Sequence, residues 1–171
     1  MDAPDVVDGM QADWRSLQPG LDVTSMGVIH RLLRASRYIL EQSDAFLAGY
    51  GLTRGELDVL SALRRSPTPL TPTELAGTLL VPPSAITMRL KALEKRDLLD
   101  RFPNPSDRRS LLAQLTTEGA DLVDEVIPAQ LTLEDSLLER MKAEDVEQLA
   151  DRLRSLVGRW EQERPPPNAR P

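Results

Sequence analysis

Apolar residues recur at helical spacing in the N-terminal third of this chain. A long helix is predicted to begin at the cap Ser25 and to end at Gly49 and Gly51. A shorter helix is predicted over residues 10–17, because a Pro-Gly pair follows it. The positions that form one face of the long helix are Ile29, Leu32, Leu33, Ile39 and Leu40. Such a face needs burial against another surface.

The middle of the chain has the layout of a helix-turn-helix. One helix is predicted over residues 52–65, with every third or fourth position apolar. A second begins with a capping box, in which Thr71 is the cap, Pro72 takes the first position and Glu74 reaches back. It runs to about Val81, and a Pro-Pro pair separates it from a third helix over residues 83–95. Two helices joined by a tight turn are what this DNA-binding motif requires.

The third helix has two distinct faces. At 100° per residue around the helix axis, Leu90 falls 40° to one side of Ile86 and Leu93 falls 20° to the other side. These three residues therefore form the core side of the helix. The opposite side of the helix could enter a DNA major groove and contact phosphates, since its lysines stand among short or flexible side chains. An ordinary amphipathic helix with a solvated side has the same pattern. The DNA-binding candidates on this helix are Ser84, Thr87, Met88 and Lys91.

A β-hairpin is predicted after this helix. Its strands cover residues 98–102 and 110–115, around a polar turn at 104–106. Asp107, Arg108 and Arg109 lie beside the turn and are the DNA-contact candidates of a wing. The carboxylate of Asp107 is expected to hold the guanidinium of Arg109 in one orientation. Polar hairpins of this kind also occur in proteins that bind nothing there.

Charge divides the chain into three parts. The net charge is −6, yet residues 52–112 carry 10 basic and 7 acidic side chains. DNA binding depends on the local field, so an acidic total does not exclude it. Residues 1–9 and 162–171 are predicted to be disordered tails. The remaining regions are the N-terminal helices (10–51), a winged domain (52–116) and a long helical region (117–161) with a kink at Pro128 and a break near residues 142–145.

Several classes of function find no support in the composition. The chain has no cysteine and a single histidine, His30, which removes disulfides, thiolate sites and most zinc chemistry. No nucleophile–base pair or phosphate loop is present, so we expect neither an enzyme nor a cofactor. No apolar run is long enough to span a bilayer, and nothing resembles a signal peptide. A cytoplasmic protein without membrane contact is expected.

The middle segments resemble the MarR family of bacterial transcription regulators. The matching pieces are LTRGELDVLSALRR, LTPTELAGTLLVPPSAITMRLKALEKRDLLDRFPNPSDRR and LTTEGADLVDE. The resemblance implies a mainly helical fold, a winged helix-turn-helix with a two-stranded wing, and a homodimer joined by N- and C-terminal helices. It also implies binding to near-palindromic double-stranded DNA, with half-sites about 10 bp apart. Family members often have Ser or Thr before the recognition helix, where this chain has Pro82.

A narrower resemblance concerns ADWRSLQPGLDVTSMGVIHRLLRASR, which is similar to the added segment of the urate-responsive branch of that family. That branch implies ligand-binding roles for Trp14, Asp58, Arg89 and Arg101. The loop at residues 67–70 is about two residues shorter than in the branch. Urate is a flat purine anion, so two arginines can meet its charge and carbonyls while an aspartate accepts its N–H groups. A repressor released by urate is the leading expectation.

Other interpretations remain open at the level of the sequence. Asp58 could serve only to pair Arg89, Trp14 could fill a groove, and Arg101 could contact DNA. The ligand could be a phenolic acid, another aromatic anion or a different purine. A purine-handling enzyme that uses the acid–arginine cluster is a third alternative. An architectural DNA binder without a ligand is another.

Overall fold

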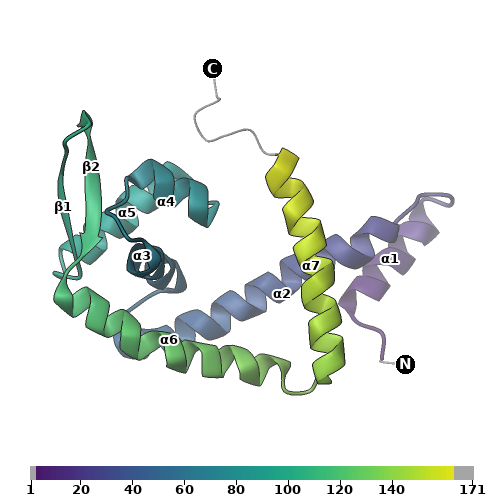
Figure 1. Cartoon of the computed structure of the whole chain (residues 1–171). Helices are drawn as coiled ribbons and strands as arrows, with labels where there is room; N and C mark the ends of the chain where they lie inside the picture. The colour runs from purple at the N-terminus through teal and green to yellow at the C-terminus, as the bar shows by residue number, and fades with distance from the viewer. Residues whose placement is uncertain (1–2, 164–171) are drawn as a thin grey trace. The chain divides into compact units, whose positions relative to one another are not determined.

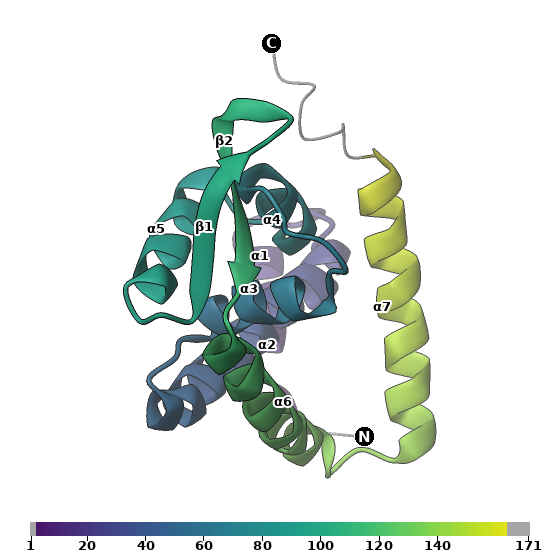
Figure 2. The ribbon, with the colours of Figure 1, turned by 60° about the vertical axis from the view of Figure 1, so that its left-hand side comes forward.

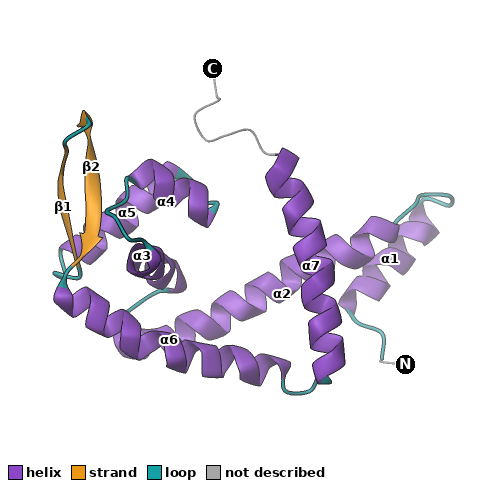
Figure 3. Ribbon diagram, viewed as in Figure 1, coloured by secondary structure: helices purple, strands orange, loops and turns teal. Residues whose placement is uncertain are grey.

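The computed structural model describes residues 3–163, apart from the side chain of Arg108 (Figure 1). The chain forms two compact units, one ending at Phe46 and one beginning at Leu47. As expected, the fold is mainly helical with one two-stranded antiparallel sheet in the described residues (Figure 3).

The N-terminal unit is a pair of helices, α1 (Val6–Leu17) and most of α2 (Thr24–Leu47). Helix α1 begins four residues before the predicted start, so the expectation of disorder over residues 1–9 is wrong for residues 5–9. Asp5 forms a capping box with Asp8, and Arg31 of α2 donates to the carboxylate of Asp5 at 2.8 and 2.9 Å. These contacts use the acidic residues that made the segment look disordered. The other predicted tail lies largely outside the described residues, since α7 ends at Glu163.

Three helices form the core of the C-terminal unit. They are α3 (Arg54–Arg65), α4 (Pro72–Leu79) and α5 (Pro83–Glu94), preceded by the 3₁₀ helix η1 (Ala48–Tyr50). The predicted capping box at Thr71 with Glu74 is present, and α3 begins with a second one, at Thr53 with Glu56. The fully buried side chains of these helices are Leu57, Val59, Leu60, Leu75, Ile86, Leu90 and Leu93.

The turn between α4 and α5 is tight. Helix α4 ends at Leu79, two residues earlier than predicted, because Leu80 takes a left-handed conformation with φ 55°. Pro82 then precedes α5 and offers no side-chain cap, as the sequence implied. The helix-turn-helix is therefore confirmed as a structure.

The sheet pairs β1 (Leu99–Asn104) with β2 (Asp107–Leu115), and Figure 2 shows the hairpin projecting beyond the helices. Both strands extend further toward the tip than predicted, with an irregularity between Pro103 and Asn104. Residue Leu70 bonds to Ala113 at both its N–H (3.0 Å) and its carbonyl (2.8 Å), which fixes the loop after α3 to the hairpin.

Two further helices complete the C-terminal unit. Helix α6 (Thr117–Leu138) passes through Pro128 as one continuous element, and α7 (Ala143–Glu163) follows a short link at the predicted break. None of the residues in α7 is buried. No helix among residues 3–163 is long and apolar enough to cross a membrane.

Candidate functional site

The outer face of α5 is exposed as its sequence predicts. Ile86, Leu90 and Leu93 are 0% exposed. On the opposite side Met88 is 69% exposed, and Ser84, Thr87 and Lys91 are exposed as well. The hydroxyl of Thr87 donates to the carbonyl of Pro83 at 3.0 Å, which leaves its oxygen free to accept. The helix thus presents a lysine, a methionine and two hydroxyls on one solvent-facing side.

The tip of the hairpin is ordered by side chain–backbone hydrogen bonds. Asp107 accepts the backbone N–H of Arg109 at 3.0 Å, and Ser110 donates to the carbonyl of Asp107 at 3.2 Å. The expected contact between the Asp107 carboxylate and the Arg109 guanidinium is wrong, because the carboxylate turns back to the main chain in an Asx-type turn. Arg109 is exposed and has no ion pair within the described residues. The side chain of Arg108 lies outside the described part of the structure.

Arg101 connects the hairpin to α5. Its Nε donates to Glu94 at 2.9 Å and its Nη2 donates to the same carboxylate oxygen. The Arg101 side chain is only 17% exposed, so the pair is partly shielded from water. The pairing was not predicted, because Glu94 and Arg101 are seven residues apart and belong to different elements.

Arg89 lies against the first turn of α3. A Cβ built on Gly55 would fall 2.5 Å from the Cζ of Arg89, so the guanidinium occupies space that only glycine leaves open. No carboxylate is paired with Arg89 anywhere in residues 3–163. An arginine near the positive end of a helix is poised to accept an anion.

Asp58 is bound by Arg54 and not by Arg89. The Nε of Arg54 donates to Asp58 at 3.0 Å, and its Nη1 donates to Glu134 of α6 at 2.8 Å. Burial by itself would lower the pKa of the Arg54 guanidinium, but Asp58 and Glu134 outweigh it and raise that pKa. The pairing of Asp58 with Arg89, one of the open interpretations, is therefore wrong. The i,i+4 spacing of Arg54 and Asp58 was the signal that sequence reasoning missed.

Asp58 and Arg54 border a cavity of about 250 Å³ between α3 and α6. Its polar walls include Gln130 and Glu134, and its apolar walls include Leu131. Neither Arg89 nor Arg101 lines it. Trp14 lies on α1 in the N-terminal unit, so the convergence of the four ligand candidates stays a prediction.

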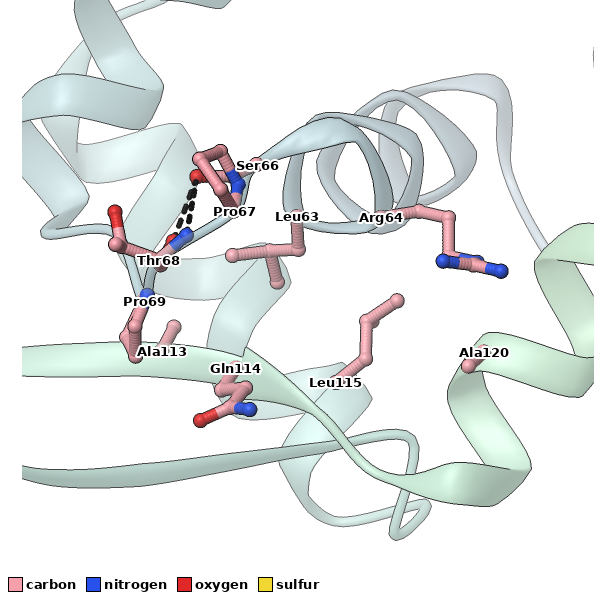
Figure 4. Close-up of a pocket in the computed structure, with 10 residues that line it drawn as sticks. All are labelled: Leu63, Arg64, Ser66, Pro67, Thr68, Pro69, Ala113, Gln114, Leu115 and Ala120. Carbon is pink, nitrogen blue, oxygen red and sulfur yellow. Dashed lines mark hydrogen bonds between the residues drawn. The ribbon is translucent and has the colours of Figure 1, made fainter.

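A second cavity, of about 220 Å³, lies where the end of α3, residues 66–69, β2 and α6 meet (Figure 4). Ser66 donates to the carbonyl of Thr68 at 2.6 Å along one wall. Arg64 extends from α3 toward α6, where it binds Asp124 through two nitrogens at 2.9 and 2.8 Å. That pair raises the pKa of Arg64 and lowers the pKa of Asp124. With both charges satisfied, this cavity has no unmatched charge to attract a ligand.

The described residues contain no group of three or more His, Asp or Glu side chains that could hold a metal ion. The polar groups of the site are instead arginines, carboxylates, hydroxyls and a lysine, of which the arginines, the lysine and the hydroxyls suit recognition of phosphates and other anions.

Comparisons with known proteins agree with this geometry. A family model described as "MarR family" matches residues 50–110. The transcriptional regulator PecS of Dickeya dadantii is 36% identical over 150 residues, which cover 86% of this chain and 88% of that protein. A mutant MarR from Escherichia coli in complex with operator DNA has a TM-score of 0.70 and 26% identity, covering 80% of this chain and 99% of that one.

CouR from Rhodococcus jostii RHA1, solved with bound p-coumaroyl-CoA, has a TM-score of 0.64 and 25% identity over 73% of this chain and 87% of its own. Of these proteins, PecS is named a transcriptional regulator, and the mutant MarR was solved on operator DNA.

Proposed function

The chain belongs to the MarR family of DNA-binding transcription regulators, and from this premise we propose that it is a repressor that binds a near-palindromic operator as a homodimer and is released by a small aromatic anion. The exposed outer face of α5 is the observation that carries the proposal, because it has the composition of a helix that reads a major groove. Met88 would contact thymine methyl groups, and Lys91 would contact phosphate or guanine.

The wing would contact DNA beside the recognition helix. The backbone of the tip is fixed by Asp107, so Arg109 extends from an ordered turn and not from a mobile loop. An arginine presented in this way can enter a narrow minor groove and sense its width. Arg108 would contact the backbone from the same turn.

A homodimer would cover apolar surface that one chain leaves exposed. Leu149, Val157 and Trp160 of α7 are exposed large apolar residues, and no residue of α7 is buried. Exposed apolar patches on a protein mark interaction surfaces, and burying apolar surface is worth about 25 cal/mol per Å². Helix α2 of the N-terminal unit has exposed large apolar residues of its own, namely Val28, Ile29, Leu33, Ile39 and Leu40.

Urate is the proposed ligand, held by Trp14, Asp58, Arg89 and Arg101. Two features support this choice: Arg89 has no carboxylate partner in the described part of the chain, and Asp58 borders a cavity. An anion that draws Arg101 away from Glu94 would separate the wing strand from the recognition helix. Release of DNA would follow from this local change. Moving the equilibrium from 1:99 to 99:1 needs about 5.5 kcal/mol of differential affinity.

A phenolic or other aromatic anion is the second candidate ligand. The observation that favours it is that Arg101 and Arg54 are already paired, which leaves Arg89 as the principal cation for a simple carboxylate. The structural relative CouR was solved with a CoA ester of an aromatic acid. The proposed location is the cytoplasm, where bacterial DNA is found.

Gel-shift titrations of the protein on an operator selected from random DNA would test the proposal. Urate, xanthine and salicylate are compared, with wild-type protein and with Arg89→Ala. We expect urate to release the wild-type protein and to have little effect on the variant. Release by salicylate alone would select the second ligand class, and no release by any of the three would favour an architectural DNA binder.

A further inference from the structure

We infer that Arg96 is a positioning residue for DNA binding: it fixes the tilt of α5 and thereby sets the spacing between the two recognition helices. The inference rests on the proposed use of α5 as the recognition helix. Arg96 follows α5 directly and is exposed, yet its Nη1 donates to the carbonyl of Gly51 at 2.8 Å. The two residues are 45 positions apart in the chain.

Gly51 is an anchor point because its own conformation is fixed. It takes a left-handed φ of 66° and donates its N–H to Ala48 at 3.0 Å, while the next residue, Leu52, donates to Leu47 at 3.0 Å. The Nη2 of Arg96 lies 3.5 Å from where a Cβ on Gly51 would be, so the guanidinium is in close contact with this residue. The segment that joins α2 to α3 is therefore bonded directly to the end of α5.

The other side of the same turn is held by α6. Thr116 donates its hydroxyl to the carbonyl of Asp97 at 2.7 Å and its N–H to the carbonyl of Leu98 at 3.3 Å. Gly119 lies so close to Leu98 that a Cβ would fall 1.9 Å from its carbonyl oxygen. Asp97 takes a φ of 57°, which bends the chain sharply here. Residues 96–98 thus connect α5 with the chain segments that enter and leave the winged domain.

This arrangement makes the end of α5 the point about which the helix would rotate. Ser84 lies 12 residues before Arg96, or about 18 Å along a helix. A rotation of about 5° at the turn would move Ser84 by more than about 1 Å. Displacements of this size matter, because hydrogen bonds to base edges require donor–acceptor distances within a few tenths of an ångström.

A direct contact between Arg96 and phosphate is the competing explanation, since the side chain is exposed. The two roles differ in salt dependence. Removing a phosphate contact reduces the slope of log K against log salt by about 0.9. Removing a hydrogen bond that only fixes the tilt of α5 lowers affinity and leaves that slope unchanged.

The test compares Arg96→Gln with wild type on the selected operator and on duplexes with one base pair added or removed between the half-sites. We expect binding to the native spacing to weaken about 3- to 10-fold, in line with the loss of one hydrogen bond. We also expect an unchanged salt slope and a smaller penalty for altered spacing. Lys91→Gln, which removes a proposed DNA contact, should reduce the salt slope.

A slope reduced by about 0.9 in Arg96→Gln would overturn the inference in favour of a phosphate contact. Unchanged affinity and unchanged spacing preference would overturn it as well. Should Arg96→Gln fail to fold, Arg96→Lys retains the charge and one donor, and an intermediate loss of spacing preference is expected. If the wild-type protein selects no operator, the proposed function fails instead, so the two failures are distinguishable.

Discussion

The guanidinium of Arg89 rests on Gly55, with its Cζ 2.5 Å from the position of an added Cβ. We predict that Gly55→Ala displaces Arg89 at little cost to stability. Alanine favours a helix over glycine by up to about 1 kcal/mol, and the group that must move is the end of a flexible side chain. Thermal unfolding should shift by only a few degrees, whereas calorimetry should show urate affinity reduced as much as in Arg89→Ala.

The double variant Gly55→Ala/Arg89→Ala is the control for this prediction. If both changes act through the same guanidinium, the double variant binds urate no more weakly than Arg89→Ala alone. Additive losses would mean that Gly55 acts through something other than Arg89.

Gly119 differs from Gly55 because its neighbour is backbone. A Cβ there would lie 1.9 Å from the carbonyl oxygen of Leu98 and 2.8 Å from its carbon. We predict that Gly119→Ala lowers the free energy of unfolding by about 2 kcal/mol or more, since α6 must move away from the turn after α5. Urea denaturation measures the change. Gly9→Ala is the matched control, because nothing lies within 4 Å of the added Cβ. An equal free energy of unfolding for the two variants would contradict the prediction.

Local features of this fold could be predicted from the sequence. The capping boxes at Thr53 and Thr71 and the buried face of α5 follow from rules that involve residues three or four positions apart. The ends of the elements were less accurate, as at Leu80, where a left-handed leucine stops α4 without a sequence signal.

The ion pairs of the candidate site could not be predicted, because each depends on which elements pack together. Glu134 lies 80 positions from Arg54, and only the packing of α6 on α3 brings them within 2.8 Å. The same holds at the N-terminus, where Arg31 lies 26 positions from Asp5 and orders a segment whose composition indicates disorder. Sequence reasoning suggested Arg89 as a partner of Asp58 and the Arg109 guanidinium as a partner of Asp107, and the structure gives both carboxylates other partners.

The bridge from Arg54 to Glu134 should contribute measurably to the stability of the C-terminal unit. A double-mutant cycle with Arg54→Gln and Glu134→Gln is predicted to give a coupling energy of about 0.5–1.5 kcal/mol, near the upper end for partly exposed pairs. The Arg54 side chain is 26% exposed, which keeps the value below that of a fully buried pair. Arg54→Lys should lose most of the stabilisation that this bridge provides, since a single ammonium group cannot bind Asp58 and Glu134 at the same time as well as a guanidinium does. Additivity within about 0.3 kcal/mol would show that the bridge contributes nothing.

The start of α1 should be sensitive to acid. Arg31 is the main reason that the pKa of Asp5 falls to about 2 from 3.8. Because the folded-state pKa is lowered, the stabilisation is present above pH 3.8 and is lost as the pH falls toward 2. Amide exchange in the first turn of α1 should therefore increase over that range. In Arg31→Gln the pKa of Asp5, followed by NMR, should rise toward its ordinary value, and an unchanged titration would assign the shift to the backbone N–H groups of Val7 and Asp8 instead.

The hydrogen bond from the Arg109 N–H to Asp107 should matter for DNA binding through geometry and not through charge. Asp107→Asn and Asp107→Ala both remove a negative charge near phosphate, but only asparagine retains an oxygen that accepts the N–H at 3.0 Å. We therefore predict that Asp107→Ala binds the selected operator about 3- to 10-fold more weakly than Asp107→Asn, with the same salt slope.

Arg109→Ala separates the role of the turn from the role of the side chain that it presents. Its salt slope should fall by about 0.9 relative to wild type, because one cation–phosphate contact is lost. Equal affinities for the two Asp107 variants would show that the turn does not orient Arg109. An unchanged slope in Arg109→Ala would place the guanidinium away from DNA, and the contribution of the wing would then have to come from its backbone and from Arg108.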